Sequence, residues 1–257
     1  MRIFTSKKRP YKNLLIALED GSWGEITPLP GRSKETIQDI LESGLDKNKF
    51  PSAAFGLLPL PQEPLSWPVA ALFMGSLPEI FARAEKMCDF THAKLKVGSL
   101  PLAEGVHAAT HLKDHFRLRI DFNNLWKKED VLAFCQEFKP EDFDFLEDPG
   151  TDVSPFKSAA DDENNRADFR VWKPSVLGIP KSSTNLILSS AYETGIGTAR
   201  LVQLAHHLNL PQHPIGLGTY HYLEEDLLKK PLQFEKGKIY IPARLEPDLD
   251  SLKHLVF

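Results

Sequence analysis

The chain has 257 residues, with 31 basic and 35 acidic side chains, so its formal net charge is -4. This balance argues against a nucleic-acid or anionic-membrane partner. The apolar run from Leu14 to Leu18 ends at Glu19, too soon for a signal-peptide core or a membrane span. Cys88 and Cys135 stand in apolar contexts, so we expect two buried, reduced thiols in a cytoplasmic protein.

The first ninety residues predict a small α+β domain. Residues 13–26 form a hairpin pattern around a turn at Asp20 and Gly21. We expect a helix to follow, with Ser33 as its N-cap and Gly44 at its C-terminal end. A proline-rich stretch then leads to a second helical pattern between Leu77 and Met87.

From residue 91 to 257 the pattern changes to short β-rich runs that alternate with helical ones. This alternation is typical of a parallel sheet or a (β/α) barrel. The length of the chain accommodates a barrel with a small partner domain. The expected strands lie at 94–97, 116–120, 143–146, 169–172 and 186–188, with helical patterns at 131–138 and 201–208.

Charged residues recur near the ends of these expected strands, at intervals of 20 to 26 residues. The C-terminal ends of successive strands in a (β/α) barrel surround one pocket, so such residues become neighbours in space. The series is the pair Lys94 and Lys96, then Asp121, Glu147, Lys173 and Glu193.

Lys94 and Lys96 are two residues apart on one strand, so both side chains point to the same face, about 7 Å apart. Taken alone, this pair fits the solvated edge of a strand. Inside a barrel, two ammonium groups lower each other's proton affinity, and a nearby metal ion lowers it further. A lysine shifted in this way becomes a general base.

Asp121 and Glu147 each follow a run of β-forming residues, where a carboxylate alone fits a turn or a helix cap. Together, on neighbouring strand ends, they are hard oxygen ligands suited to Mg²⁺. Lys173 alone fits a surface lysine. Ser189 and Ser190 precede a helical pattern, where hydroxyls and backbone N–H groups favour an anion, or serve only as a cap.

Taken in order, these segments resemble the enolase superfamily, and within it the dehydratase branch of menaquinone biosynthesis. The resemblance runs from about residue 13 almost to Leu228. Its motifs are Trp23-Gly-Glu-Ile-Thr-Pro-Leu-Pro-Gly-Arg-Ser-Lys-Glu-Thr, Pro51-Ser-Ala-Ala-Phe-Gly, Ala93-Lys-Leu-Lys-Val-Gly, Arg117-Leu-Arg-Ile-Asp-Phe-Asn-Asn-Leu-Trp, Phe145-Leu-Glu-Asp-Pro, Lys173-Pro-Ser-Val-Leu-Gly, Ser189-Ser-Ala-Tyr-Glu-Thr-Gly and Gly216-Leu-Gly-Thr.

The resemblance implies an enolase-type barrel that removes a proton α to a carboxylate and then eliminates a hydroxyl group on the same face. Lys96 is implied as the base and as the acid for the leaving hydroxyl, Lys94 as the group that tunes it, and Lys173 as the stabiliser on the opposite face. The implied Mg²⁺ ligands are Asp121 and Glu147. The implied substrate contacts are Arg119, Ser189, Ser190 and Gly216.

The chain departs from the family pattern at two places. Only 26 residues separate Glu147 from Lys173, where the family has a strand that carries a third acidic ligand, followed by a helix. We therefore expect a barrel shortened on this side, without that strand and helix. We expect the third ligand to be Asp162, with Asp161 and Glu163 as alternatives. The N-terminal domain is also expected to be truncated and to lack the loop that closes over the substrate.

The function expected from the resemblance is Mg²⁺-dependent syn dehydration of a hydroxycyclohexadiene carboxylate in menaquinone biosynthesis, with a small-molecule carboxylate as the partner. Two alternatives stay open. Racemisation of N-acylamino acids uses the same two lysines on opposite faces. A non-catalytic barrel kept for binding is the other alternative, although a binding protein has no use for crowded, unpaired charges, which cost stability.

Overall fold

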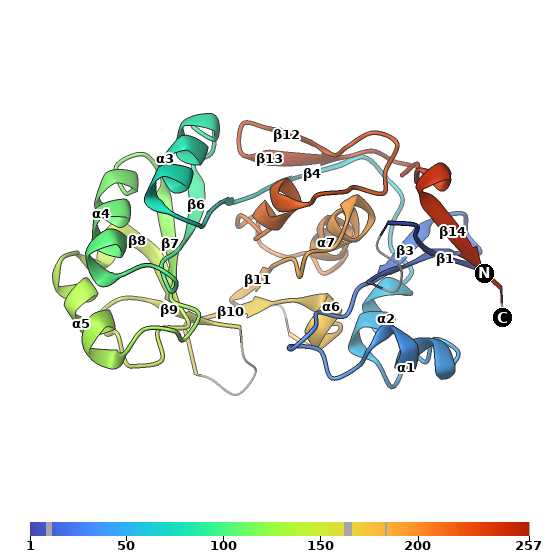
Figure 1. The fold of residues 1–257 in the computed structure, drawn as a ribbon, viewed down its shortest axis with the longest axis horizontal. Coiled ribbons are helices and arrows are strands. Elements are labelled where there is room, and N and C mark those ends of the chain that lie inside the picture. The colour runs from blue at the N-terminus through green and yellow to red at the C-terminus, as the bar shows by residue number, and fades with distance from the viewer. Residues whose placement is uncertain (9–11, 162–165, 183, 257) are drawn as a thin grey trace.

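The computed structural model describes residues 1–8, 12–161, 166–182 and 184–256, and its centre is a sheet of seven parallel strands (Figure 1). The strands follow one another across the sheet in chain order, as in a (β/α) barrel. They are β5 (Ala71–Phe73), β6 (His92–Lys96), β7 (Arg117–Asp121), β8 (Phe143–Glu147), β9 (Ser158–Ala160), β10 (Phe169–Trp172) and β11 (Leu186–Leu188).

A short segment at Ile215 and Gly216 links the two edges of this sheet. Ile215 pairs in parallel with Val69, next to β5, and Gly216 pairs in parallel with Ser189, at the end of β11. The N–H groups of Ala70 and Ser190 donate to this segment at 3.1 and 2.9 Å. The sheet therefore closes on itself, and the expected (β/α) barrel is confirmed.

Three helices cover the outer face of β5 to β8, on the left of Figure 1: α3 (Leu77–Lys86), α4 (Leu102–Leu112) and α5 (Lys128–Gln136). The first of them begins with a capping box, in which Ser76 and Glu79 bond each other's backbone N–H groups. Residues such as Leu118 and Ile120 are fully buried in the core, and each such side chain stabilises the fold by roughly 1.5–3 kcal/mol.

The barrel is shortened after β8, as expected, but the expected loss of a strand there is wrong. Strand β9 (Ser158–Ala160) pairs with β8 on one side and β10 on the other. Between β8 and β10 no helix lies in the parts of the chain that the structure describes. The next helix, α6 (Pro174–Leu177), is a single turn. Three residues suffice for a paired strand, and a run so short leaves little periodicity in the sequence.

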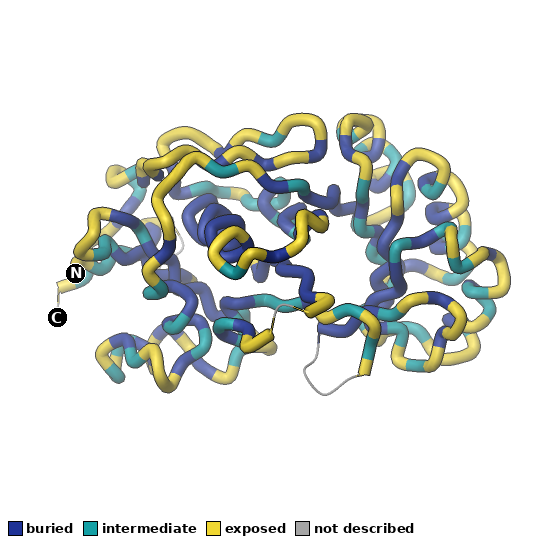
Figure 2. Tube along the Cα trace, turned by 180° about the vertical axis from the view of Figure 1, so that it is seen from behind, coloured by how far each residue is buried: buried dark blue, intermediate teal, exposed yellow. Residues whose placement is uncertain are grey.

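Helix α7 (Gly195–His207) is buried from Gly195 to Ala205, and it lies as a dark blue core in Figure 2. It contacts β3 on one side and β4 on the other. Strand β4 (Leu65–Pro68) belongs to a three-stranded antiparallel sheet with β12 (Gln233–Glu235) and β13 (Lys238–Ile241). A helix that is covered by strands on more than one side is apolar over most of its length.

A four-stranded antiparallel sheet, in the order β14-β1-β2-β3, stands beside the barrel. Its C-terminal strand pairs with its N-terminal strand, so the ends of the chain lie close together (Figure 1). Its elements are β1 (Arg2–Ser6), β2 (Leu14–Ala17), β3 (Trp23–Ile26) and β14 (Leu252–Leu255), with α1 (Ile37–Glu42) and α2 (Pro51–Gly56) nearby. The 3₁₀ turns in the described part of the chain are η1 (Pro140–Asp142), η2 (Gly218–Tyr222) and η3 (Leu249–Ser251).

Two local predictions are corrected. The N-cap of α1 is Thr36, paired with Asp39 in a capping box, whereas Ser33 accepts a hydrogen bond from the N–H of Leu29. Neither cysteine is buried as expected: Cys88 is exposed, because it lies just beyond the last turn of α3, and Cys135 is half-buried. Among the described residues, no helix is long and apolar enough to cross a membrane.

Candidate active site

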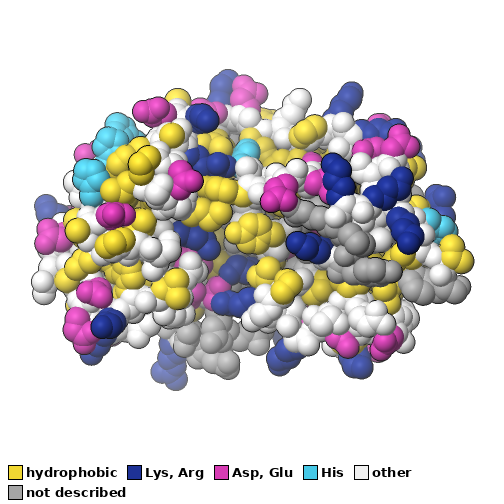
Figure 3. All heavy atoms as spheres, in the orientation of Figure 1, with side chains coloured by type: hydrophobic (Ala, Val, Ile, Leu, Met, Phe, Trp, Pro, Cys, Tyr) yellow, Lys and Arg dark blue, Asp and Glu magenta, His cyan; other side chains and the backbone are white. Residues whose placement is uncertain are grey.

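A cavity of about 190 Å³ lies at the C-terminal ends of the barrel strands. Figure 3 shows this face hollowed near its middle, with basic side chains around the hollow. Parallel strands bring the residues that follow them to one end of the barrel, which explains why positions far apart in the sequence meet here. Of the residues singled out in the sequence, those that line the cavity are Lys94, Lys96, Lys173, Ser189, Ser190, Gly216 and the alternative metal ligand Asp161.

Lys94 bridges the two carboxylates of the neighbouring strands. Its Nζ lies 2.6 Å from Glu147 Oε1 and 2.9 Å from Asp121 Oδ2. Burial alone would lower the pKa of Lys94, but the charges of Asp121 and Glu147 outweigh it and hold that pKa above its ordinary value. Lys94 is therefore held in its ammonium form by the two carboxylates and is poorly suited to act as a base.

Lys96 sits at the end of β6, 3.8 Å from Asp121 Oδ2, with 30% of its side chain exposed. Burial lowers its pKa below the ordinary 10.5, and the positive charge of Lys94 lowers it further. The two lysines are thus shifted in opposite directions, because only Lys94 has close bonds to two carboxylates. Of this pair, Lys96 is the one suited to proton transfer.

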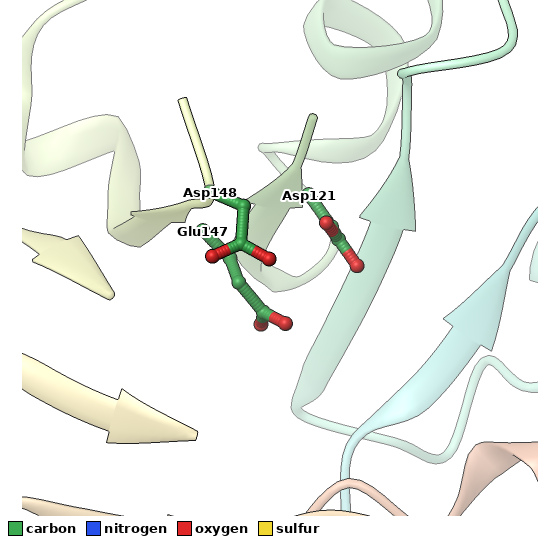
Figure 4. A group of neighbouring side chains, drawn as sticks. All are labelled: Asp121, Glu147 and Asp148. Atoms are coloured by element: carbon green, nitrogen blue, oxygen red, sulfur yellow. The ribbon is translucent and has the colours of Figure 1, made fainter. Parts of the chain in front are cut away.

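Three buried carboxylates, Asp121, Glu147 and Asp148, place ligand oxygens within 4.8 Å of one another. Figure 4 shows the three side chains as neighbours. Burial raises the pKa of Glu147, and it raises that of Asp148 to about 7 with help from the charges of Asp161 and Glu147. Crowded acidic oxygens of this kind suit a hard divalent cation, which would offset their repulsion.

Asp161 follows β9 directly and lines the cavity next to Asp148. Its Oδ2 accepts a short hydrogen bond from Lys173, and its Oδ1 lies 2.7 Å from a guanidinium nitrogen of Arg32. Although burial opposes the shift, the charge of Lys173 and the bond from Arg32 lower the pKa of Asp161. Its N–H donates to Asp148 at 3.1 Å, which ties β9 to the end of β8.

Ser189, Ser190 and Gly216 form another wall of the cavity. The hydroxyl of Ser189 bonds the carbonyl of Gly216 at 3.3 Å, and that of Ser190 bonds Thr219. A Cβ at Gly216 would lie 2.7 Å from Ser189 Oγ, so the close approach of the two segments requires glycine here. This wall offers hydroxyl and backbone groups to a ligand.

Of the expected site residues that the structure describes, Asp121, Glu147 and Arg119 are not among those that line the cavity. Asp121 and Glu147 are bonded to Lys94, which does line it. Arg119 is buried deeper in the barrel, where it bonds the carbonyl of Pro214 at 2.7 Å and Asp144 at 3.3 Å. It is not among the residues that line the cavity, so its contact with substrate stays a prediction. Asp162, the expected third metal ligand, lies outside the described residues, as does Glu163.

Three residues gain importance only from the structure. Asp148 stands in the Glu-Asp-Pro motif, and its position directly after Glu147 was the one signal for it. Asp161 was only an alternative, because its strand was not expected. Arg32 lies within the first motif of the resemblance but was given no role, and it enters the cavity from the loop between β3 and α1, far from the barrel in sequence.

A second cavity, of about 560 Å³, lies between the N-terminal sheet and the loop after β11. It shares Leu29, Ala191 and Tyr192 with the smaller one. Although it is larger, it is not lined by the lysines or carboxylates of the barrel. The chemistry of the site therefore belongs to the smaller cavity.

No protein-family model matches the chain. Among curated proteins it is similar to the o-succinylbenzoate synthase of Photorhabdus laumondii, 25% identical over 81% of each chain. It is also similar to those of Yersinia enterocolitica, 26% identical over 84% of this chain and 85% of that one, and Vibrio cholerae, 29% identical over 76% and 77%. These relatives agree with the resemblance inferred from the motifs.

Solved structures show the same fold. A muconate lactonizing enzyme superposes with a TM-score of 0.74 over 98% of each chain, at 18% identity. The muconate cycloisomerase of Pseudomonas fluorescens gives a TM-score of 0.71 over 97% of this chain and 96% of that one, also at 18% identity. The expected enolase-type barrel, with an antiparallel sheet from the N-terminal part of the chain beside it, is confirmed.

Proposed function

We propose that the chain is a Mg²⁺-dependent dehydratase that converts 2-succinyl-6-hydroxy-2,4-cyclohexadiene-1-carboxylate to o-succinylbenzoate in menaquinone biosynthesis. The observation that carries this proposal is the arrangement of Lys96 and Lys173 in one cavity, next to the buried carboxylates Asp121 and Glu147. The names of the curated relatives support the same reaction.

Lys96 removes the proton from the ring carbon α to the carboxylate, as the base with the lowered pKa. The resulting ammonium group then protonates the hydroxyl on the neighbouring ring carbon. The C–O bond breaks, water leaves and the ring becomes aromatic. Lys173 stabilises the negative charge that develops on the carboxylate from the other side of the cavity, and Lys94 keeps the proton affinity of Lys96 low.

Asp121 and Glu147 are the proposed Mg²⁺ ligands, and the crowded, buried oxygens around them fit a hard cation. Two described carboxylates can supply the third ligand. Asp148 already lies within reach of the other two, whereas Asp161 would have to share an oxygen now bonded to Lys173 or Arg32. A bound cation would supply Lewis-acid stabilisation of charge on the substrate carboxylate.

Racemisation of N-acylamino acids is the second candidate, because Lys96 and Lys173 both line the cavity and can each face one side of a carbon acid. The two reactions share proton abstraction and differ in whether a leaving group is present. Loss of α-deuterium from an N-acylamino acid, together with inversion, would reveal this activity. A cytoplasmic location stays a prediction.

Genetic complementation tests the proposed function. We expect the chain to restore menaquinone synthesis in a bacterium whose o-succinylbenzoate synthase gene is deleted, and the Lys96→Ala variant to fail. The variant should reach the same soluble level, because Lys96 is partly exposed and bonds no residue closely. If wild type and variant both restored growth, or if neither did at equal expression, the assignment would be wrong.

A further inference from the structure

Glu193 belongs to the series of charged residues near the strand ends, and the proposed reaction leaves it unused. It is fully buried and lies in the loop between β11 and α7. A carboxyl group that leaves water is strongly disfavoured unless it is hydrogen-bonded. The hydrogen-bond partners of Glu193 therefore show which parts of the site this side chain holds.

The two carboxyl oxygens of Glu193 bond two different segments of the chain. The hydroxyl of Ser175, in α6, donates to Oε1 at 2.5 Å, and the N–H of Ala191 donates to Oε2 at 2.6 Å. Ser175 follows Lys173 after one residue, and Ala191 comes directly after Ser190. Glu193 therefore links the turn that begins at Lys173 to the cavity wall that contains Ser190.

This link continues the pairing of β10 and β11 beyond the end of the sheet. The pairing ends with the bond from the N–H of Ser189 to the carbonyl of Trp172, at 2.8 Å. The two segments then separate, one into α6 and the other towards α7. Helix α6 is a single turn, which needs contacts with other segments to be stable, and it contacts α2. Across the described parts of the chain, the next hydrogen bond between the two segments is the one from Ser175 to Glu193.

We propose that Glu193 is a positioning residue, which fixes Lys173 relative to the serine wall of the cavity through its bond to Ser175. This inference rests on the proposed function, in which Lys173 stabilises developing negative charge. Such a group must be in place before the reaction begins, and a displacement of about 1 Å can cost roughly 100-fold in rate. The proposed metal ligands end β7 and β8, which β9 separates from β10, so the metal site should not move with α6.

Steady-state kinetics of variants in Mg²⁺ test the link. Ser175→Ala removes one hydroxyl and Glu193→Met removes both hydrogen bonds. Each should lower kcat by roughly 10- to 100-fold, with a smaller effect on KM and less than about a twofold change in Mg²⁺ affinity. The two changes together should be no worse than Glu193→Met alone by more than about twofold, because they break the same link.

Glu193→Gln should retain most of kcat, because its amide can accept from the N–H of Ala191 and donate to the hydroxyl of Ser175. Burial raises the pKa of Glu193 to about 7, so the neutral carboxyl that the amide resembles is already well populated at neutral pH. Thr198→Val is the matched control. It removes a buried hydroxyl that bonds the backbone carbonyl of Glu193 at 3.5 Å but is not part of the link, so kcat should not change.

Acetylation of lysines, followed by mass spectrometry, reports on the position of Lys173 without turnover. Labelling of Lys173 relative to Lys96 should rise at least about threefold in Ser175→Ala and Glu193→Met, because α6 is loosened. The ratio should stay at its wild-type value in Glu193→Gln and Thr198→Val.

The role of Glu193 would be overturned by a wild-type kcat in Ser175→Ala, by an equal loss in Thr198→Val, or by a Glu193→Gln variant as slow as Glu193→Met. An unchanged labelling ratio in both Ser175→Ala and Glu193→Met would overturn it as well. If the wild type shows no turnover but the labelling ratio changes as expected, the proposed function is contradicted and the link is not.

Discussion

Replacement of Lys94 by methionine would leave Asp121 and Glu147 buried without the ammonium group that now bonds both, at 2.9 and 2.6 Å. The side chain is only 13% exposed, so solvent cannot take over its role. Loss of one partner from a buried ion pair costs about 3–5 kcal/mol. At roughly 2–4 °C per kcal/mol for a chain of this size, the Tm of metal-free protein should fall by about 10 °C.

Mg²⁺ should reverse much of this loss, because a cation on the same carboxylates replaces the missing positive charge and binds only the folded state. Thermal unfolding followed by circular dichroism, with EDTA or with Mg²⁺, measures both effects. Lys113→Met is the control, since Lys113 pairs with Asp114 and Asp142 at the surface and its loss should change Tm little. If Lys94→Met melted within about 2 °C of wild type, or responded to Mg²⁺ no more than wild type, the account of the acidic group would be refuted.

The other predictions concern proton transfer, metal binding and the thiols. Lys96→Ala should lower kcat far more than KM, because it removes a group needed only for the chemical step; a kcat near that of wild type would show that another residue is the base. The kcat/KM of wild type should rise with pH along a limb whose pKa lies below 10.5, since the deprotonated form of Lys96 is active and burial lowers its pKa; a limb at or above that value would contradict the assignment. Asp121→Asn and Glu147→Gln should each weaken Mg²⁺ binding in a calorimetric titration, because each removes a charged ligand; unchanged affinity in both would exclude this site. Iodoacetamide should modify Cys88 before Cys135, because Cys88 is exposed while burial raises the pKa of Cys135 to about 11; the reverse order, read by mass spectrometry, would count against the fold around α5.

The parts of the molecule that sequence reasoning predicted well are those with strong local signals. Strands β6, β7 and β8 are short β-rich runs that each end in a charged residue, and a parallel barrel brings such ends together whatever the loops contain. The order of Lys96, Asp121 and Glu147 along the chain was therefore sufficient to predict that they meet. Helix α7 was also predictable, because its apolar pattern is long.

The parts that were missed depend on contacts between distant segments. Strand β9 has three residues, and only its pairing with β8 and β10 makes it a strand. The entry of Arg32 into the cavity depends on how the N-terminal loop meets the barrel, which no local pattern encodes. The opposite pKa shifts of Lys94 and Lys96 also needed coordinates, since they follow from which lysine touches the carboxylates.

The central claim is that the barrel residues of this chain carry out a metal-dependent dehydration. Its most direct test is turnover of 2-succinyl-6-hydroxy-2,4-cyclohexadiene-1-carboxylate by purified protein, followed by the change in absorbance as the diene becomes aromatic. We predict stoichiometric o-succinylbenzoate with Mg²⁺, none after exhaustive chelation, and recovery when Mg²⁺ or Mn²⁺ is added back. Absence of product under conditions in which the Vibrio cholerae relative is active, or full activity in chelated protein, would contradict the claim.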